Sequence, residues 1–218
     1  MTRAQYQSQL SDLMGRLGSM ADHAKGMLRD GVRAFETLDR GLAEDVDHRK
    51  EILADFDESI EMQALRLLAL QNPMAGDLRH IGATLKIITY LNRLGRYGRD
   101  IGNVMVRWPQ GKPHVFDVID LPKMADNVEE MLDIVLDAFH RDESPDIPRL
   151  VRLENEVDTM RRRIWDSCLV QMMSSPQHVE ACAYYQQIAR YLERCGDNVC
   201  KMAEKLHYAA TGERIIVK

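Results

Sequence analysis

The chain has 218 residues and a net charge of -5, and 45% of its residues are apolar. This length allows one large domain or two of about 100 residues, with enough apolar residues for a substantial core. The basic residues are dispersed, which argues against a nucleic-acid binder, and the scarcity of aromatic residues, Gly and Pro argues against a β-sandwich or barrel.

The N-terminal residues, MTRAQYQSQL, are polar and lack the apolar segment of a signal peptide. No apolar run approaches the roughly 20 residues of a membrane span. We therefore expect a soluble, cytoplasmic protein. Its four cysteines form no C-x-x-C motif and are interpreted as reduced thiols in or near the core, rather than as a disulfide or zinc site: Cys168, Cys182, Cys195 and Cys200.

Apolar residues recur at helical spacing along nearly the whole chain. The pattern predicts six helices, at residues 4–40, 43–71, 74–106, 118–141, 147–173 and 177–210. Pro73 and Pro176 each separate the second helix of a half from the third, because proline ends a helix and suits the first turn of the next. Residues 107–116, RWPQGKPHVF, contain two Pro and one Gly and are the predicted linker between the halves.

The second half of the chain repeats the first. Leu91 and Leu192 lie on matching apolar seams 101 residues apart, and GMLRDGVRAF at residues 26–35 resembles EMLDIVLDAF at residues 130–139, at an offset of 104. We therefore predict an all-α fold of two tandem three-helix bundles, with a continuous six-helix bundle as the alternative. The predicted boundaries are 1–106 for the first bundle, 107–116 for the linker and 117–218 for the second bundle.

Two pairs of acidic residues flank the apolar seams of the second half. They are Glu154 with Asp158 and Glu193 with Asp197, each pair four residues apart. Side chains at this spacing project from one face of a helix, so neighbouring helices could bring four carboxylates together. A bound cation would relieve their repulsion, and oxygen ligands suit magnesium, calcium, manganese or iron, while zinc also accepts carboxylates. Asp137 could add a fifth carboxylate from the remaining helix.

Acids four residues apart are also common on solvated helix faces. Nearby arginines could neutralise these acids without a metal: Arg161, Arg162, Arg163, Arg190 and Arg194. The residue pattern alone leaves both interpretations open, a metal site and a solvated acidic edge.

Several segments resemble the signatures of the PhoU family of phosphate-uptake regulators. ARYLERCGDNVCKMAE followed by ATGE resembles the family's C-terminal signature, and ALRLLALQNPMAGDLRHIGATLKI resembles that of the first repeat. ENEVD and LDAF match two further family motifs, so the resemblance covers essentially the whole chain.

This resemblance implies two similar three-helix bundles that bind metal through E/D-x-x-x-D motifs, as iron or zinc clusters in some members. It also implies a negative regulator of phosphate uptake and phosphate-responsive signalling, not an enzyme. The implied partners are the ATPase of a phosphate ABC transporter and a sensor histidine kinase. Membrane association is then expected only through a partner. A homodimer is an open possibility. Carried onto this chain, the metal motifs fall on Glu154, Asp158, Glu193 and Asp197, with Asp137 as a further candidate.

The first half departs from the family pattern. Asn92 and Arg96 stand at the repeat positions of Glu193 and Asp197. The other three expected ligand positions also lack an acid, being occupied by Arg33, Lys50 and Ala54. We therefore expect no metal in the first bundle. We expect its cations to pair instead with acids nearby, such as Glu51, Asp55 or Asp100.

Three functional classes follow from these observations. The leading one is a metal-binding regulatory adaptor. The second is an enzyme with a carboxylate-bridged di-metal site in a helical bundle, a class whose sites combine glutamates with E-x-x-H motifs from paired helices. The third is a structural adaptor that holds no metal.

Overall fold

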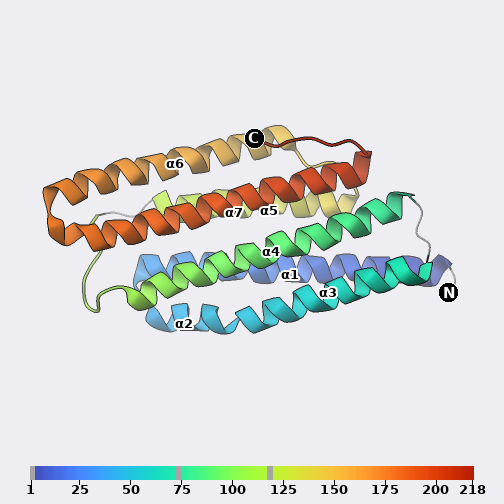
Figure 1. Cartoon of the computed structure of the whole chain (residues 1–218), viewed down its shortest axis with the longest axis horizontal. Helices are drawn as coiled ribbons and strands as arrows, with labels where there is room; N and C mark the ends of the chain where they lie inside the picture. The colour runs from blue at the N-terminus through green and yellow to red at the C-terminus, as the bar shows by residue number, and fades with distance from the viewer. Residues whose placement is uncertain (1–2, 72–74, 117–119) are drawn as a thin grey trace.

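The chain folds into long helices that run along one direction (Figure 1). The structure is a computed structural model, and it describes residues 3–71, 75–116 and 120–218. The elements are α1 (Arg3–Thr37), α2 (Arg40–His48), α3 (Lys50–Gln71), α4 (Ala75–Arg107), α5 (Asp120–Arg141), α6 (Ile147–Ser174), the short 3-10 helix η1 (Pro176–His178) and α7 (Val179–Thr211). No strand occurs in these residues, which confirms the predicted all-α class.

The helix boundaries match the sequence prediction with one exception. The predicted helix at 43–71 is two helices, and α2 and α3 meet at Arg49. α2 begins three residues before the predicted start at residue 43, because the Asp39 side chain caps it by accepting the N–H of Leu42 at 3.0 Å. At the break, the Arg49 carbonyl lies 3.0 Å from the His23 ring of α1 and its guanidinium bonds Asp30 of α1. These contacts tie the bend to α1. Pro73, predicted to end the second helix, lies outside the described residues.

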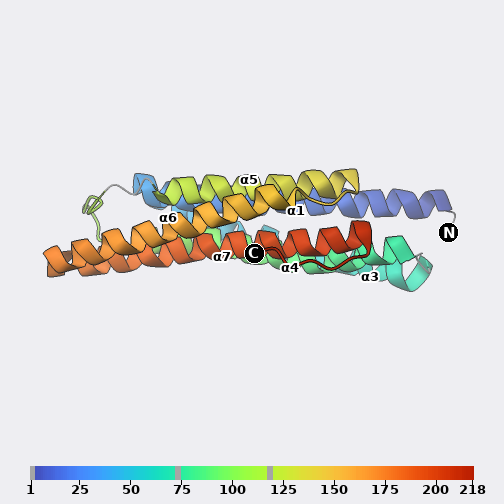
Figure 2. The same ribbon diagram turned by 90° about the horizontal axis from the view of Figure 1, so that it is seen from above.

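The helices form two bundles that pack side by side. The first contains α1, α2, α3 and α4, and the second contains α5, α6 and α7. They meet where α4 packs against α7 and α1 against α5, so the buried apolar side chains form one continuous core. The α3–α4 and α6–α7 corners lie at opposite ends of the molecule, and Figure 2 shows α1 and α5 in one layer with α4 and α7 in another.

Two glycines allow α1 and α4 to cross very closely. A Cβ built on Gly98 would lie 2.5 Å from the carbonyl carbon and oxygen of Met27. A Cβ built on Gly31 would overlap the Gly98 carbonyl oxygen in turn. The hydrogen side chain of glycine is therefore required for this backbone-to-backbone contact.

The segment between the bundles is packed rather than loose. Trp108 is 3% exposed, and its ring contacts those of Phe35 and His114. Tyr185 of α7 accepts the Val115 N–H at 3.0 Å, and its hydroxyl lies 3.1 Å from His114 Nδ1. His114 Nε2 lies 3.0 Å from the Phe35 carbonyl oxygen. Because a carbonyl only accepts, Nε2 carries the ring proton and Nδ1 accepts from Tyr185. The predicted linker thus joins α1 to α7.

No helix among the described residues combines the length and apolar character that a membrane crossing requires.

Candidate functional site

The four acids of the second bundle come from two neighbouring helices. Glu154 and Asp158 lie on α6, and Glu193 and Asp197 lie on α7. Asp146 fixes the start of α6, because its side chain accepts the N–H of Arg149 at 3.1 Å. A proline in the first turn also favours this start. The apolar seam residues beside the acids are buried, whereas Glu154, Asp158 and Glu193 are half-buried and Asp197 is exposed. The acids therefore line the edge of the core.

The four carboxylates share one electrostatic neighbourhood. Burial raises the pKa of Glu154, and the charges of Asp158, Asp197 and Glu193 raise it further. Burial also raises the pKa of Glu193. The charge of Arg190 lowers this pKa, and the charge of Asp197 raises it further. The structure therefore brings together the two pairs that the sequence singled out, and their mutual repulsion is the condition that a cation would relieve.

Arginines neutralise part of this charge. Arg190 Nη1 donates to both carboxylate oxygens of Glu193, at 2.7 and 2.9 Å. Arg162 lies 3.9 Å from Asp158, at the limit of an ion pair. In the part of the chain that the structure describes, no three acidic, histidine or cysteine side chains are arranged to hold a metal ion. The donor chemistry fits a hard cation, but the side chains do not form a closed ligand cage.

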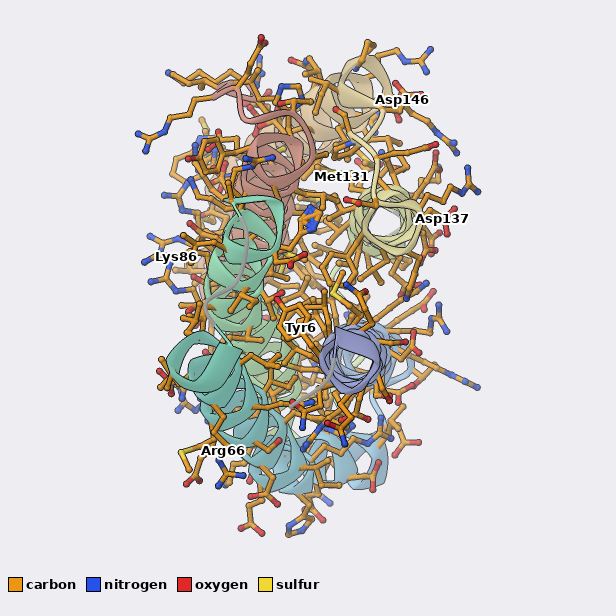
Figure 3. All side chains as sticks on the ribbon, turned by 90° about the vertical axis from the view of Figure 1, so that its right-hand side faces the viewer. Tyr6, Arg66, Lys86, Met131, Asp137 and Asp146 are labelled. Atoms are coloured by element: carbon orange, nitrogen blue, oxygen red, sulfur yellow. The ribbon has the colours of Figure 1, made fainter. Side chains whose placement is uncertain are left out.

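Asp137 lies apart from this cluster. Its side chain is 72% exposed on α5 and 3.9 Å from Arg141, one turn along the same helix. Figure 3 shows Asp137 on the outer side of α5, while Met131 of the same helix lies toward α7. Asp137 is also not among the groups that shift the pKa of Glu154.

One E-x-x-H sequence occurs at the end of α7, from Glu204 to His207. Glu204 accepts from Lys201 at 2.7 Å and from the Val217 N–H at 3.2 Å. His207 Nδ1 lies 2.7 Å from the Ser144 hydroxyl. Both side chains therefore stabilise the C-terminal tail and a nearby loop, and the motif has no metal-ligand geometry within the described residues.

The corresponding edge of the first bundle has a different polar arrangement. Asn92 Nδ2 donates to Asp57 of α3 at 3.1 Å. Burial raises the pKa of Asp57, while the Asn92 hydrogen bond lowers it, Glu61 raises it and Arg96 lowers it. At the 104-residue offset Asp57 corresponds to Arg161, which lies near Glu193 and lowers its pKa. The two bundles thus place opposite charges at equivalent positions.

Among the described residues, no ion pair joins Arg33, Lys50 or Arg96 to the expected acids Glu51, Asp55 and Asp100. Glu51 and Asp55 are exposed on the other face of α3, and Asp100 accepts from Arg99 at 2.7 Å. Lys50 pairs with Asp47 at 2.8 Å. The acid that bonds Asn92 is Asp57, two residues after Asp55 in the sequence.

Two features were not found from the sequence. One is the packed linker around His114 and Tyr185, and the other is a basic cavity between α4 and α7 that is described below. The tyrosines and lysines involved occur at helical spacing, but the sequence did not show that these helices from different repeats face each other.

The four cysteines are all free and buried, as expected. Burial raises the pKa of Cys168 to about 12, and that of Cys200 to about 12 with a further contribution from Glu154. Both thiols are therefore protonated at neutral pH in the metal-free protein.

The chain is similar to known proteins along its whole length. It is 31% identical over 216 residues to a phosphate-specific transport system accessory protein PhoU homolog of Clostridium acetobutylicum, covering 99% of this chain and 98% of the relative. It is 32% identical over 213 residues to the homolog of Caulobacter vibrioides, covering 96% of this chain and 91% of the relative.

Solved structures support the fold. The crystal structure of PhoU from Pseudomonas aeruginosa matches with a TM-score of 0.89 at 23% identity, covering 95% of this chain and 100% of that one. PhoU from Streptococcus pneumoniae matches with a TM-score of 0.85 at 20% identity, covering 96% of this chain and 99% of that one. The family model for the PhoU domain matches twice, at residues 17–105 and 121–206, one match in each predicted half, so the chain belongs to the PhoU family.

Proposed function

We propose that this protein is a regulatory accessory protein of phosphate transport that acts by docking on other proteins. The observation that carries the proposal is the full-length similarity to PhoU homologs named as accessory proteins of the phosphate-specific transport system. We propose a negative effect on phosphate uptake and phosphate-responsive signalling, exerted in the cytoplasm through the transporter ATPase and a sensor histidine kinase. None of the side-chain arrangements described above suggests catalysis.

We further propose that the acidic cluster of the second bundle binds a divalent or trivalent cation, such as iron, zinc, manganese or magnesium. Glu154 and Asp158 would hold it from α6, and Glu193 and Asp197 from α7. The raised pKa of Glu154 is consistent with this assignment, since it reflects burial first and then the negative charges of Asp158, Asp197 and Glu193. Asp137 would need to approach from the exposed face of α5, so the proposal relies on the other four acids.

A bound cation would supply positive charge that joins α6 to α7. In the metal-free protein Arg190 neutralises part of the negative charge by bonding both oxygens of Glu193, but both residues lie on α7, so this pair does not join the two helices. Metal binding would place the cation in competition with Arg190 for the carboxylate of Glu193. Competition of this kind is a means by which metal availability could change the surface of the second bundle.

Metal content of the purified protein tests the site. Elemental analysis should show metal in the wild type and little in the double variant Glu193→Gln, Asp197→Asn. The matched control is Glu51→Gln with Asp55→Asn, which removes two exposed carboxylates four residues apart from the first bundle and should leave the metal content unchanged. Equal metal content in all three proteins would reject the site, and a metal-free but functional wild type would favour the metal-free adaptor.

A deletion strain tests the regulatory role. Loss of the gene should switch on a phosphate-starvation reporter in phosphate-rich medium, and expression of the wild type should switch it off again. Affinity capture with the separate ATPase and histidine-kinase proteins should identify the docking partner. A reporter that stays off in the deletion strain, together with turnover of a small substrate by the metal-loaded protein, would favour the enzyme class.

A further inference from the structure

A cavity of about 460 Å³ lies between the first half of α4 and the last turns of α7. Its lining includes Arg79 and Lys86 from α4, Lys205 and Tyr208 from α7, and Arg214 from the C-terminal tail. The volume is in the range of small-molecule pockets, roughly 300 to 1,000 Å³. Figure 3 shows Lys86 on the outer side of α4, on the opposite side of the molecule from Asp137.

The charge of this cavity contrasts with that of the whole protein. The protein carries a net charge of -5, yet four cationic side chains line the cavity against a single carboxylate, that of Glu204. Glu204 is already occupied, since it accepts from Lys201 at 2.7 Å and from the Val217 N–H at 3.2 Å. Glu204 Oε2 also lies 3.9 Å from Lys205 Nζ, so it partly neutralises Lys205 and leaves Arg79, Lys86 and Arg214 as the cations without a carboxylate partner among the described residues.

Two of the cations have donors to offer a ligand. Arg79 Nε donates to the Ala209 carbonyl at 3.1 Å, which anchors the guanidinium. Its terminal nitrogens have no hydrogen-bond partner, and Lys86 has no ion pair, among the described residues. A guanidinium fork and a lysine ammonium are the usual protein groups for binding phosphate oxygens.

The remaining walls suit an organic part of a ligand. The guanidinium carbon of Arg214 lies 5.5 Å from the centre of the Tyr208 ring, a cation–π contact that orders the ring. Leu78, Ala83 and Ile215 supply apolar surface beside it.

We propose that this cavity binds a phosphate-bearing small molecule. Arg79 and Lys86 would contact the phosphate, and Arg214 with Tyr208 would close over the other end. The proposal does not depend on the metal site, because the cavity shares no residue with the four acids.

Titration calorimetry on the full-length protein tests this assignment, with inorganic phosphate and ADP as separate probes. At least one probe should bind. Lys86→Gln and Arg214→Gln should each weaken binding by about tenfold or more, the cost of losing one charge-assisted contact. Both side chains are exposed, so neither change should lower the melting temperature.

The matched control is Arg93→Gln. Arg93 is an exposed cation two turns along α4 that rests on Tyr90 and does not line the cavity. It lies about 10 Å from Lys86 along the helix axis, beyond the Debye length at physiological salt, so its loss should change binding by less than about twofold. The Glu193→Gln, Asp197→Asn variant should also bind the probe unchanged.

Comparison of the two probes identifies the source of the phosphate. If ADP binds more tightly than inorganic phosphate, the wall formed by Tyr208 contacts the organic part of the ligand. If the two probes bind equally, the ligand is free phosphate. Failure of both probes at millimolar concentration, or equal weakening by Lys86→Gln and Arg93→Gln, would overturn the proposal. Binding only to phosphatidylcholine vesicles that contain phosphatidylglycerol, with neither probe bound, would overturn it in favour of a membrane surface.

Discussion

The close crossing of α1 and α4 predicts that Gly98→Ala is strongly destabilising. The added methyl group would lie 2.5 Å from the carbonyl carbon and oxygen of Met27 and 2.6 Å from the backbone nitrogen of Leu28. These are backbone atoms of a buried helix, so no side-chain rotation can relieve the overlap. The two helices must move apart along a large part of the core.

The expected magnitude is the difference between two effects. Overpacking of a core costs about 1–3 kcal/mol and sometimes more, while alanine is favoured over glycine in a helix by about 1 kcal/mol. Because the overlap is with backbone, we expect the upper part of that range and a net loss of about 2 kcal/mol. In a chain of this size this corresponds to a melting temperature lower by about 4–8 °C.

Thermal unfolding followed by circular dichroism measures this effect, with Gly15→Ala as the control. A Cβ at Gly15 would meet nothing within 4 Å, so this change in α1 should raise stability by about 0.5–1 kcal/mol. The opposite signs separate helix propensity from packing. If Gly98→Ala were as stable as Gly15→Ala, the close approach of α1 and α4 would be wrong.

Three further predictions concern the acidic cluster, the linker and a helix cap. Burial and neighbouring carboxylates raise the folded-state pKa of Glu154, so metal-free protein loses stability as pH rises through and above the ordinary glutamate value of about 4.3. Glu154→Gln should therefore raise the melting temperature at neutral pH by about 1–2 °C, with the gain vanishing in acid, whereas a lower value at neutral pH would contradict the repulsion. Tyr185→Phe leaves the partly buried Val115 N–H without its acceptor and should cost about 1–3 kcal/mol in denaturant unfolding; an unchanged midpoint would mean that the linker is not held by this bond. Asp39→Ala removes the cap on the Leu42 N–H and should cost about 1 kcal/mol, while Asp39→Asn should retain most of the stability.

The helices and the duplication could be predicted because both depend on local pattern. The spacing of apolar residues gives a helix its buried face wherever the helix lies, and Leu91 and Leu192 mark the same seam in the two halves. The break at Arg49 could not be predicted, because it depends on contacts to His23 and Asp30 on another helix.

The acidic cluster was predictable in part. Glu154 with Asp158 and Glu193 with Asp197 were identified from spacing alone, and the electrostatic coupling between the two pairs agrees with that prediction. Arg190 was one of several arginines that the sequence offered as neutralising groups, and its bond to Glu193 follows the local i,i+3 spacing on α7. The approach of Arg161 of α6 to Glu193 of α7 depends instead on how the two helices pack.

The sequence by itself determined the all-α class, the repeated bundles, the acidic edge and the family. The tertiary structure decided which surfaces of the two bundles meet, and with them the Asn92–Asp57 pair, the packed linker and the basic cavity. The physical reason is that helix periodicity is set within one segment of chain, whereas each of these features depends on the relative rotation and closeness of segments far apart in sequence. That relation is fixed by packing, as at Gly31 and Gly98, where the absence of a side chain allows α1 and α4 to touch.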